Sequence, residues 1–274
     1  MTPKLVNIKD STSQGVLRLL QISDTHLYAD PNRTLAGINT LQTFEQVLEL
    51  ADEHPADMVL ATGDLVHDAS ESGYEALRTR FDQMQLPVYC LPGNHDEPDV
   101  LNQTLQKGTV YTDKCTTWGN WLLIFLDSTK PGEPGGNLNE QELSFLEECL
   151  ATHPQHHVLI CLHHHPTPSG SQWLDSMALD NPDAMFSILD RHNGVKGILW
   201  GHIHQDFLTQ RDGIRMMGSP STCIQFAPDE ADFKLDPLPP GFRWLELTPD
   251  GEIKTGVKRL QETPVGLSLS TVGY

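Results

Sequence analysis

Up to about residue 200, short apolar runs alternate with segments of helical period. The apolar runs are rich in valine, isoleucine and leucine, as is typical of strands buried on both faces. They cover residues 16–23, 58–62, 88–91, 121–127, 157–162 and 197–200. Between them, apolar residues recur at the spacing of one helix face, as in Leu41, Phe44, Leu48 and Ala51, in Leu77, Phe81 and Met84, and in Leu143, Leu146 and Leu150. This alternation predicts an α/β fold.

Two of the predicted helices carry start signals. Asn139 followed three residues later by Glu142 resembles a capping box, in which two side chains satisfy the free amide groups at a helix start. Asn181 precedes Pro182, which places an N-cap residue before a proline at the first helical position. We therefore expect helices to begin just after Asn139 and Asn181.

After about residue 205 the pattern changes to short strands with turn signals. The predicted strands cover residues 206–210, 214–217, 243–248 and 252–258, with Asp212-Gly213 and Asp250-Gly251 as turns. We expect this tail to be antiparallel, with the proline-rich residues 235–241 as a loop. The whole chain, 1–274, is then interpreted as one α/β domain, a mixed β-sheet sandwich flanked by helices. Its core covers about 16–260, and residues 1–15 form an N-terminal extension.

Composition and charge exclude several classes of function. The 274 residues include 37 acidic and 18 basic ones, for a net charge of −19, so we expect neither a nucleic-acid polymer nor a membrane surface as partner. No apolar run approaches the roughly 18 residues of a membrane span, and no secretory signal is visible. The five cysteines form no C-x-x-C pair, as is typical of reduced thiols. We expect a cytoplasmic protein with a small-molecule substrate; its oligomeric state stays open.

Polar residues of metal-ligand type follow five of the six predicted core strands. Open α/β sheets bind ligands at the carboxyl ends of their strands. The clusters are Asp24-Thr25-His26, Gly63-Asp64, Asn94-His95-Asp96, His163-His164-His165 and His202-Ile203-His204. Each cluster alone is more often a turn or a solvated loop, but their conjunction at equivalent positions predicts a metal site.

The residue types also indicate which metals are expected. Imidazole with carboxylate and amide oxygen, and without thiolate, suits manganese, iron, zinc or cobalt. Iron or manganese is expected first, with zinc and cobalt as alternatives. Seven candidate ligands exceed the need of one open catalytic site, and two ions roughly 3.5–4 Å apart form the usual clamp for phosphate esters. Two divalent metal ions then require a bridging carboxylate.

The order of motifs, D-x-H, GD, GNHD, a histidine before proline and G-H-x-H, resembles that of the calcineurin-like metallophosphoesterases across residues 24–204. This resemblance implies a four-layer αββα sandwich. It also implies two sets of ligands that share Asp64: Asp24, His26, Asp64 and His204 for the first metal, and Asp64, Asn94, His164 and His202 for the second. In the triple-histidine run the family pattern selects His164, with His163 and His165 as alternatives.

The same resemblance assigns catalytic and substrate-binding roles. His95 is implied as the proton donor or phosphate contact, with Asp96 orienting its ring, because a leaving alkoxide needs a proton. The implied substrate contacts are His26, Asp64, Asn94, His95 and His204. Trp173, His165 and Phe226 are candidates for an apolar wall against a purine base, although core packing is the simpler interpretation. For His67-Asp68, a solvated loop or a helix cap is preferred over a substrate contact.

Charge predicts the mechanism. Two divalent ions and the carboxylates of Asp24 and Asp64 leave the site positive by about two units inside a chain of net charge −19. An anionic phosphate is attracted there. A hydroxide bridging the two ions is then expected to attack phosphorus in line, while the ions stabilise charge on the non-bridging oxygens.

Further segments resemble the bacterial class III 3',5'-cyclic AMP phosphodiesterases over most of residues 16–260, including LLQISDTHL, ATGDLVHD, LHHHP, GHIHQ and PSTCIQF. This resemblance implies hydrolysis of cyclic AMP to 5'-AMP, and so a lowering of a second messenger. One alternative is a metallophosphoesterase for another ester, such as a 2',3'-cyclic nucleotide, a phosphoprotein or a phospholipid-derived diester. Another is a scaffold without catalysis, which is disfavoured because His95 and all seven candidate ligands are present.

Overall fold

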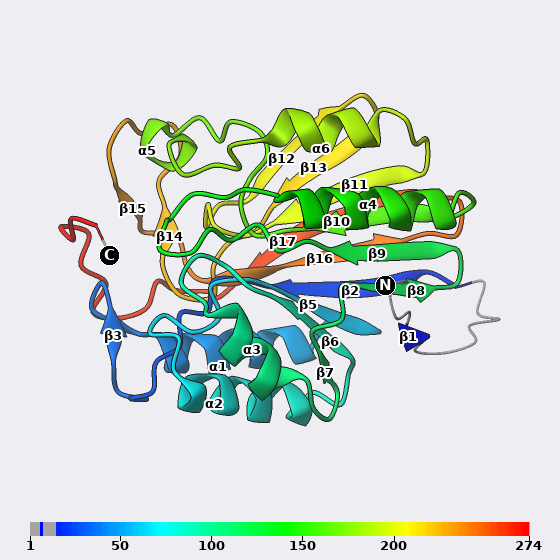
Figure 1. Ribbon diagram of the computed structural model, residues 1–274. Helices are drawn as coiled ribbons and strands as arrows, with labels where there is room; N and C mark the ends of the chain where they lie inside the picture. Colours follow the sequence, from blue (N-terminus) through cyan, green and yellow to red (C-terminus); the bar gives the residue numbers. More distant parts are fainter. Residues whose placement is uncertain (1–5, 8–14, 274) are drawn as a thin grey trace.

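Two β-sheets face each other in the computed structural model, which describes residues 6–7 and 15–273 (Figure 1). The first sheet has the strand order β17-β16-β2-β5-β6-β7. Its strands are β2 (Leu17–Ile22), β5 (Met58–Thr62), β6 (Val88–Leu91), β7 (Val110–Tyr111), β16 (Gly241–Leu247) and β17 (Ile253–Arg259).

The second sheet has the strand order β1-β8-β9-β10-β11-β13-β12. Its strands are β1 (Val6–Asn7), β8 (Cys115–Trp118), β9 (Trp121–Phe125), β10 (His157–Cys161), β11 (Val195–Trp200), β12 (Phe207–Arg211) and β13 (Ile214–Gly218). Two short antiparallel pairs lie outside both sheets: β3 (Thr34–Leu35) with β4 (Ile38–Asn39), and β14 (Gln225–Phe226) with β15 (Leu235–Asp236).

Helices cover the outer faces of the two sheets (Figure 1). The first sheet is covered by α1 (Thr40–Asp52), α2 (Glu71–Gln83) and α3 (Pro98–Leu105), and the second by α4 (Glu140–Thr152) and α6 (Pro182–Leu189). The short α5 (Gln172–Asp175) lies in the loop region after β10. None of the helices in the described part of the chain is both long and apolar enough to cross a membrane.

Alternation along the strands builds three separate hydrophobic cores. In β2, Leu17 and Leu19 belong to the core between the two sheets, whereas Leu20 and Ile22 belong to the core beneath the helices. Successive side chains of a strand point to opposite faces, so strands covered on both sides need apolar residues throughout. This explains the continuous apolar runs, and the predicted mixed-sheet sandwich flanked by helices is confirmed.

The six predicted core strands and the three helices predicted from apolar spacing are present. Asn139 caps α4 by accepting hydrogen bonds from the amides of Gln141 and Glu142, at 2.9 and 3.0 Å. The reciprocal half of the capping box is absent, because Glu142 instead pairs with Lys114 and accepts from the amide of Asp127.

Asn181 also occupies the predicted N-cap position, before Pro182. Its side chain bonds both backbone groups of Leu138, so it ties two loops together and does not cap its own helix. The sequence pattern missed α3, α5 and several strands of two to four residues, because elements this short contain too few residues to show a period.

The prediction for the tail after residue 205 is corrected in part. Its strands form two antiparallel hairpins, β12 with β13 and β16 with β17, which turn at the predicted Asp-Gly pairs. The hairpins join different sheets, however: β13 lies parallel to β11, and β16 lies antiparallel to β2. Residues 235–241, predicted as a loop, contain the short strand β15. The single-domain interpretation stays a prediction, and most of the predicted extension 1–15 lies outside the described residues.

The five cysteines are all buried, and none forms a disulfide with another described residue. This agrees with their interpretation as reduced thiols. Each side chain is enclosed within the folded chain, as is common for reduced cysteine.

Leu123→Ala tests the core between the sheets. Leu123 is fully buried there, and its truncation is expected to lower the free energy of unfolding by about 2–5 kcal/mol, measured by urea denaturation. Leu208→Ala is the matched control, because Leu208 is 55% exposed and its truncation is expected to cost less than about 0.5 kcal/mol. Equal losses in the two variants would contradict this account of the core.

Candidate metal centre

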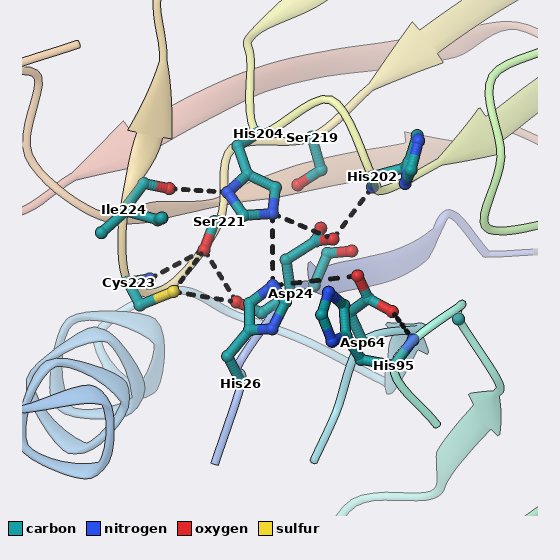
Figure 2. A network of polar contacts seen from close by, with 12 residues as sticks. Asp24, His26, Asp64, His95, His202, His204, Ser219, Ser221, Cys223 and Ile224 are labelled. Atoms are coloured by element: carbon teal, nitrogen blue, oxygen red, sulfur yellow. Dashed lines mark hydrogen bonds and ion pairs between the residues drawn. The ribbon is translucent and has the colours of Figure 1, made fainter. Parts of the chain in front are cut away.

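Loops from both sheets meet at the carboxyl ends of β2, β5, β6, β10 and β11 (Figure 2). Hydrogen bonds between the sheets hold this edge together. The side-chain amide of Gln21 donates to the Trp200 carbonyl at 2.9 Å, and the backbone amide of His202 donates to Asp24 Oδ1 at 2.9 Å. Residues far apart in the sequence are therefore fixed relative to one another at the candidate site.

The first group of candidate ligands contains Asp24, His26 and His204, all fully buried. His204 Nε2 lies 3.3 Å from Asp24 Oδ1 and 3.4 Å from His26 Nε2. Figure 2 shows the two imidazole rings and the carboxylate directed toward one another. Three ligand atoms at these separations fit the coordination sphere of one divalent cation.

The Asp64 carboxylate lies between this group and a second one. Its Oδ2 atom is 3.8 Å from His26 Nε2 on one side and 3.3 Å from His163 Nε2 on the other. Asp24, Asp64 and His163 form a second group of ligand atoms, and His163 also groups with His164 and His202. One carboxylate oxygen that lies between imidazole nitrogens of two groups has the position that a bridging ligand needs.

Several polar atoms here are buried and form no hydrogen bond within the described part of the chain. They are Asp24 Oδ2, Asp64 Oδ2, Asn94 Oδ1, His163 Nε2, and His202 Nδ1 and Nε2. An unsatisfied buried polar group costs about 1–3 kcal/mol, so such a concentration calls for another partner. The oxygens and imidazole nitrogens fit divalent transition-metal ions.

Hydrogen bonds on the far side of two rings set the direction of their Nε2 atoms. His204 Nδ1 lies 2.9 Å from the Ile224 carbonyl, and His163 Nδ1 lies 2.8 Å from the Thr62 carbonyl. Since a carbonyl only accepts, each Nδ1 carries a proton and each Nε2 is turned toward the centre. Although burial opposes it, Asp64 raises the pKa of His163 to about 9, so this ring must lose its Nε2 proton when a metal ion binds. Metal-binding histidines in general are oriented in this way.

The backbone at the site is strained. Asp24, His26, Asp64, His202 and His204 all have positive φ, between 45° and 64°. For residues other than glycine this conformation is sparsely populated and costs roughly 1–3 kcal/mol each. Five candidate ligands share it, which indicates that the loops hold a geometry that local preference alone would not select.

Two glycines permit the close approach of the loops. A Cβ atom at Gly63, whose φ is +90°, would lie 2.3 Å from His163 Nδ1. A Cβ atom at Gly201 would lie 2.2 Å from Ser23 Oγ and 2.7 Å from Asp24 Oδ2. The glycines that precede Asp64 and His202 are therefore part of the site, because any side chain there would displace a candidate ligand or its neighbour.

The protonation states of three of the buried candidate ligands favour binding of a cation. Burial lowers the pKa of His26 and His202 well below the ordinary range, so these imidazoles are neutral, as ligands must be. Burial opposes charge on Asp64 as well, but His163 and other nearby histidines hold its pKa well below the usual value. The carboxylate therefore stays ionised in a buried position.

The geometry favours His163, which the sequence left as an alternative, over the predicted ligand His164. Both His164 nitrogens already have partners: Nδ1 lies 2.8 Å from Ser128 Oγ, and Nε2 lies 3.2 Å from the Pro134 carbonyl. His163 Nε2 instead faces Asp64 and has no hydrogen bond. His165 is held by Asp175, 3.2 Å from its Nε2.

The hydrogen bonds of Asp96 go to backbone amides and to a tyrosine hydroxyl. Its carboxylate accepts hydrogen bonds from the amides of Leu65, Val66 and Gly93, and from the Tyr74 hydroxyl, at 2.8–3.1 Å. Burial, followed by the charge of Asp64, raises its pKa to about 6. These bonds join the loop after β5 to the loop after β6, so Asp96 positions the backbone of both loops. Its role in orienting the His95 ring stays a prediction.

His95 lies beside the centre, as expected for a proton donor. Its amide donates to Asp64 Oδ1 at 2.9 Å, and its ring meets that of His26 edge to face, with the centroids 5.0 Å apart. The side chain is partly exposed, unlike the buried aspartate and histidine candidate ligands. Figure 2 shows it next to Asp64. A substrate entering from solvent would meet His95 at this border.

The candidates for a purine wall belong largely to the core. Phe226 is 1% exposed and stacks on His204, with the centroids 4.1 Å apart and the planes at 12°. Trp173 packs edge to face against Phe226 and Phe233. The Phe226 ring therefore supports His204, and the simpler interpretation of core packing fits it.

Comparison with known proteins agrees with this geometry. A family model described as calcineurin-like phosphoesterase matches residues 17–206. The chain belongs to the calcineurin-like phosphoesterases. The matched segment begins with β2 and ends two residues after His204, so it contains every candidate ligand of this phosphoesterase.

Curated relatives align over nearly the full length of the phosphoesterase. The 3',5'-cyclic adenosine monophosphate phosphodiesterase CpdA of Pseudomonas aeruginosa is 39% identical over 266 residues, covering 96% of this chain and 97% of the relative. CpdA of Escherichia coli K12 is 39% identical over 261 residues, covering 94% of this chain and 95% of the relative.

Among solved structures, a dimetal phosphatase from Danio rerio matches with a TM-score of 0.62 at 17% identity, covering 88% of this chain and 98% of that one. GAP50, the anchor in the inner membrane complex of Plasmodium, matches with a TM-score of 0.65 at 14% identity, covering 94% and 90%. At these identities the likeness shows the fold alone.

Alanine variants of His163 and His164 distinguish the two candidate ligands of the phosphoesterase. His163→Ala is expected to abolish tight binding of one of two Mn²⁺ ions, because it removes the Nε2 atom that faces Asp64. His164→Ala is expected to retain both ions, because its nitrogens bond Ser128 and Pro134. Titration calorimetry on metal-stripped protein measures this, with circular dichroism to confirm folding. The reverse order of effects would restore His164 as the ligand.

Proposed function

We propose that this phosphoesterase hydrolyses 3',5'-cyclic AMP to 5'-AMP with the help of two divalent metal ions. The observation that carries the proposal is the position of the buried Asp64 Oδ2 atom between His26 Nε2 and His163 Nε2. Within the described residues, Asp64 Oδ2 and the nearby ligand atoms Asp24 Oδ2 and His163 Nε2 form no hydrogen bond. The substrate is supported by the near full-length similarity to CpdA proteins from several bacteria.

The donor set supports the choice of metal. Asp24, His26 and His204, with Asp64, would hold the first ion; Asp64, Asn94, His163 and His202 would hold the second. Nitrogen and oxygen donors without thiolate suit iron or manganese, with zinc and cobalt as alternatives. We therefore propose iron or manganese as the working metals.

When bound, two divalent ions supply positive charge for phosphate oxygens and make a nucleophile available from water near neutral pH. Asp24 and Asp64 contribute two negative charges, so the site with its ions is a positive centre in a chain of net charge −19. The rest of the surface disfavours an anion, and the phosphodiester is drawn to this one edge of the sheets.

His95 would contact the departing oxygen of the ester. Its amide is anchored on Asp64, while its partly exposed ring lies next to the candidate ligand His26. A proton or a hydrogen bond from the ring would stabilise the alkoxide that leaves when the cyclic ester opens. The cytoplasmic location and the absence of a nucleic-acid or membrane partner stay predictions.

Turnover by metal-stripped protein tests the reaction. We expect reloading with Mn²⁺ or Fe²⁺ to restore the conversion of 3',5'-cyclic AMP to 5'-AMP, which is measured by chromatography. We expect much slower turnover of 2',3'-cyclic AMP. Asp64→Asn removes the bridging charge at nearly constant volume and should abolish activity with every metal. Preference for the 2',3' isomer, or for activated esters alone, would replace cyclic AMP with another phosphodiester as substrate.

His95→Ala tests the proton donor. We expect kcat for cyclic AMP to fall by about 10²–10⁴-fold, because the leaving alkoxide is then unprotonated, while both metal ions stay bound. The kcat for bis(p-nitrophenyl) phosphate should fall much less, because its leaving group scarcely needs a proton. Equal losses on the two substrates would reject the proton-donor role.

A further inference from the structure

His67 lies between two groups of the proposed active site. It follows β5 in the loop that also carries Asp64, and it is partly buried. Its Nδ1 atom lies 3.0 Å from His26 Nδ1. Its ring stacks on that of His95, with the centroids 4.3 Å apart and the planes at 20°. One side chain therefore contacts both a candidate metal ligand and the candidate proton donor.

The backbone fixes His67 in this place. The amide of His26 donates to the Asp64 carbonyl at 2.9 Å, and the amide of Leu27 donates to the Leu65 carbonyl at 3.1 Å. The amide of His67 then donates back to the Leu27 carbonyl at 2.7 Å. These bonds join the loops after β2 and β5, so the position of His67 relative to His26 is determined by backbone and not by side-chain choice.

The contact with His26 has a defined direction. His26 Nε2 faces Asp64 and His204, so Nδ1 carries the proton when Nε2 acts as a ligand. Nδ1–H then donates to His67 Nδ1. Metal-binding histidines commonly donate this second proton to a carboxylate or a carbonyl. Here the acceptor is an imidazole.

A third ring packs against the stacked pair. The Tyr28 ring lies against His67, with the centroids 4.9 Å apart. The His95 ring meets His67 on its face and His26 on its edge. Rotation of the His95 side chain away from the centre would break both ring contacts.

We propose that His67 is a positioning residue with two separable effects. Its Nδ1 atom holds His26 in the tautomer and orientation that present Nε2 to the metal. Its ring face holds His95 in the orientation needed at the leaving group. This inference rests on the proposed function, since it takes His95 as the proton donor.

Two substitutions separate these effects. In His67→Asn, the side-chain oxygen can take the place of Nδ1 as acceptor, but the stacking ring is lost. In His67→Phe, the ring remains for stacking on His95, but the acceptor for His26 is lost. His192→Asn, at a histidine outside the site, is the matched control and should behave as the unsubstituted protein.

Metal affinity and leaving-group sensitivity are the two measurements. For His67→Phe we expect Mn²⁺ affinity, measured by chelator competition, to fall about 10–100-fold, with kcat at saturating metal nearly unchanged. For His67→Asn we expect unchanged metal affinity. Its kcat for cyclic AMP should fall by about 10²-fold, while its kcat for bis(p-nitrophenyl) phosphate stays nearly constant.

Loss of the same property in both variants, or failure of either property to change, would overturn the proposal. Circular dichroism of the metal-free variants identifies a folding defect, and either variant alone still tests its own contact. If the unsubstituted protein does not hydrolyse cyclic AMP, the proposed function fails on that result. Chelator competition then still decides the role of His67 toward His26.

Discussion

The buried Asp64 carboxylate is the constraint on which this site depends. It lies among His26, His163 and the amide of His95, and one of its oxygens has no hydrogen bond. An ionised carboxylate inside a protein is costly unless positive charge or donors surround it. The surrounding histidines supply part of that compensation, and a pair of cations would supply the rest. The strands and loops around Asp64 place the histidines and the other candidate ligands next to its carboxylate.

The sandwich provides the rigidity for this arrangement. Ligand types come from loops of both sheets, and contacts such as those of Gln21 with Trp200 and of His202 with Asp24 fix one sheet against the other. Five candidate ligands have strained backbone conformations. That strain is offset by the packing of three hydrophobic cores, one of which reaches the polar edge at Phe226. Stability and chemistry thus come from different parts of the same strands.

A layer of supporting contacts surrounds the ligands. Phe226 stacks on His204, the carbonyls of Ile224 and Thr62 orient the rings of His204 and His163, and Asp96 joins two loops through backbone amides. None of these groups contributes a ligand atom. They hold the rings and loops in place, and the two carbonyls determine which nitrogen of His163 and His204 faces the centre. The inference on His67 extends the same principle to the proton donor.

The core strands and the donor types at their ends followed from the sequence, because buried parallel strands are apolar throughout and their carboxyl ends share one edge. The choice between His163 and His164 did not follow. Neighbouring residues at a strand end point in different directions, and only packing against Thr62, Ser128 and Pro134 decides which ring reaches Asp64. The bonds of Asp96 to Leu65, Val66 and Tyr74 were hidden for the same reason, since these partners are distant in sequence. Local pattern determined the strands and donor types, whereas the direction of each side chain depended on contacts that exist only after the two sheets have packed.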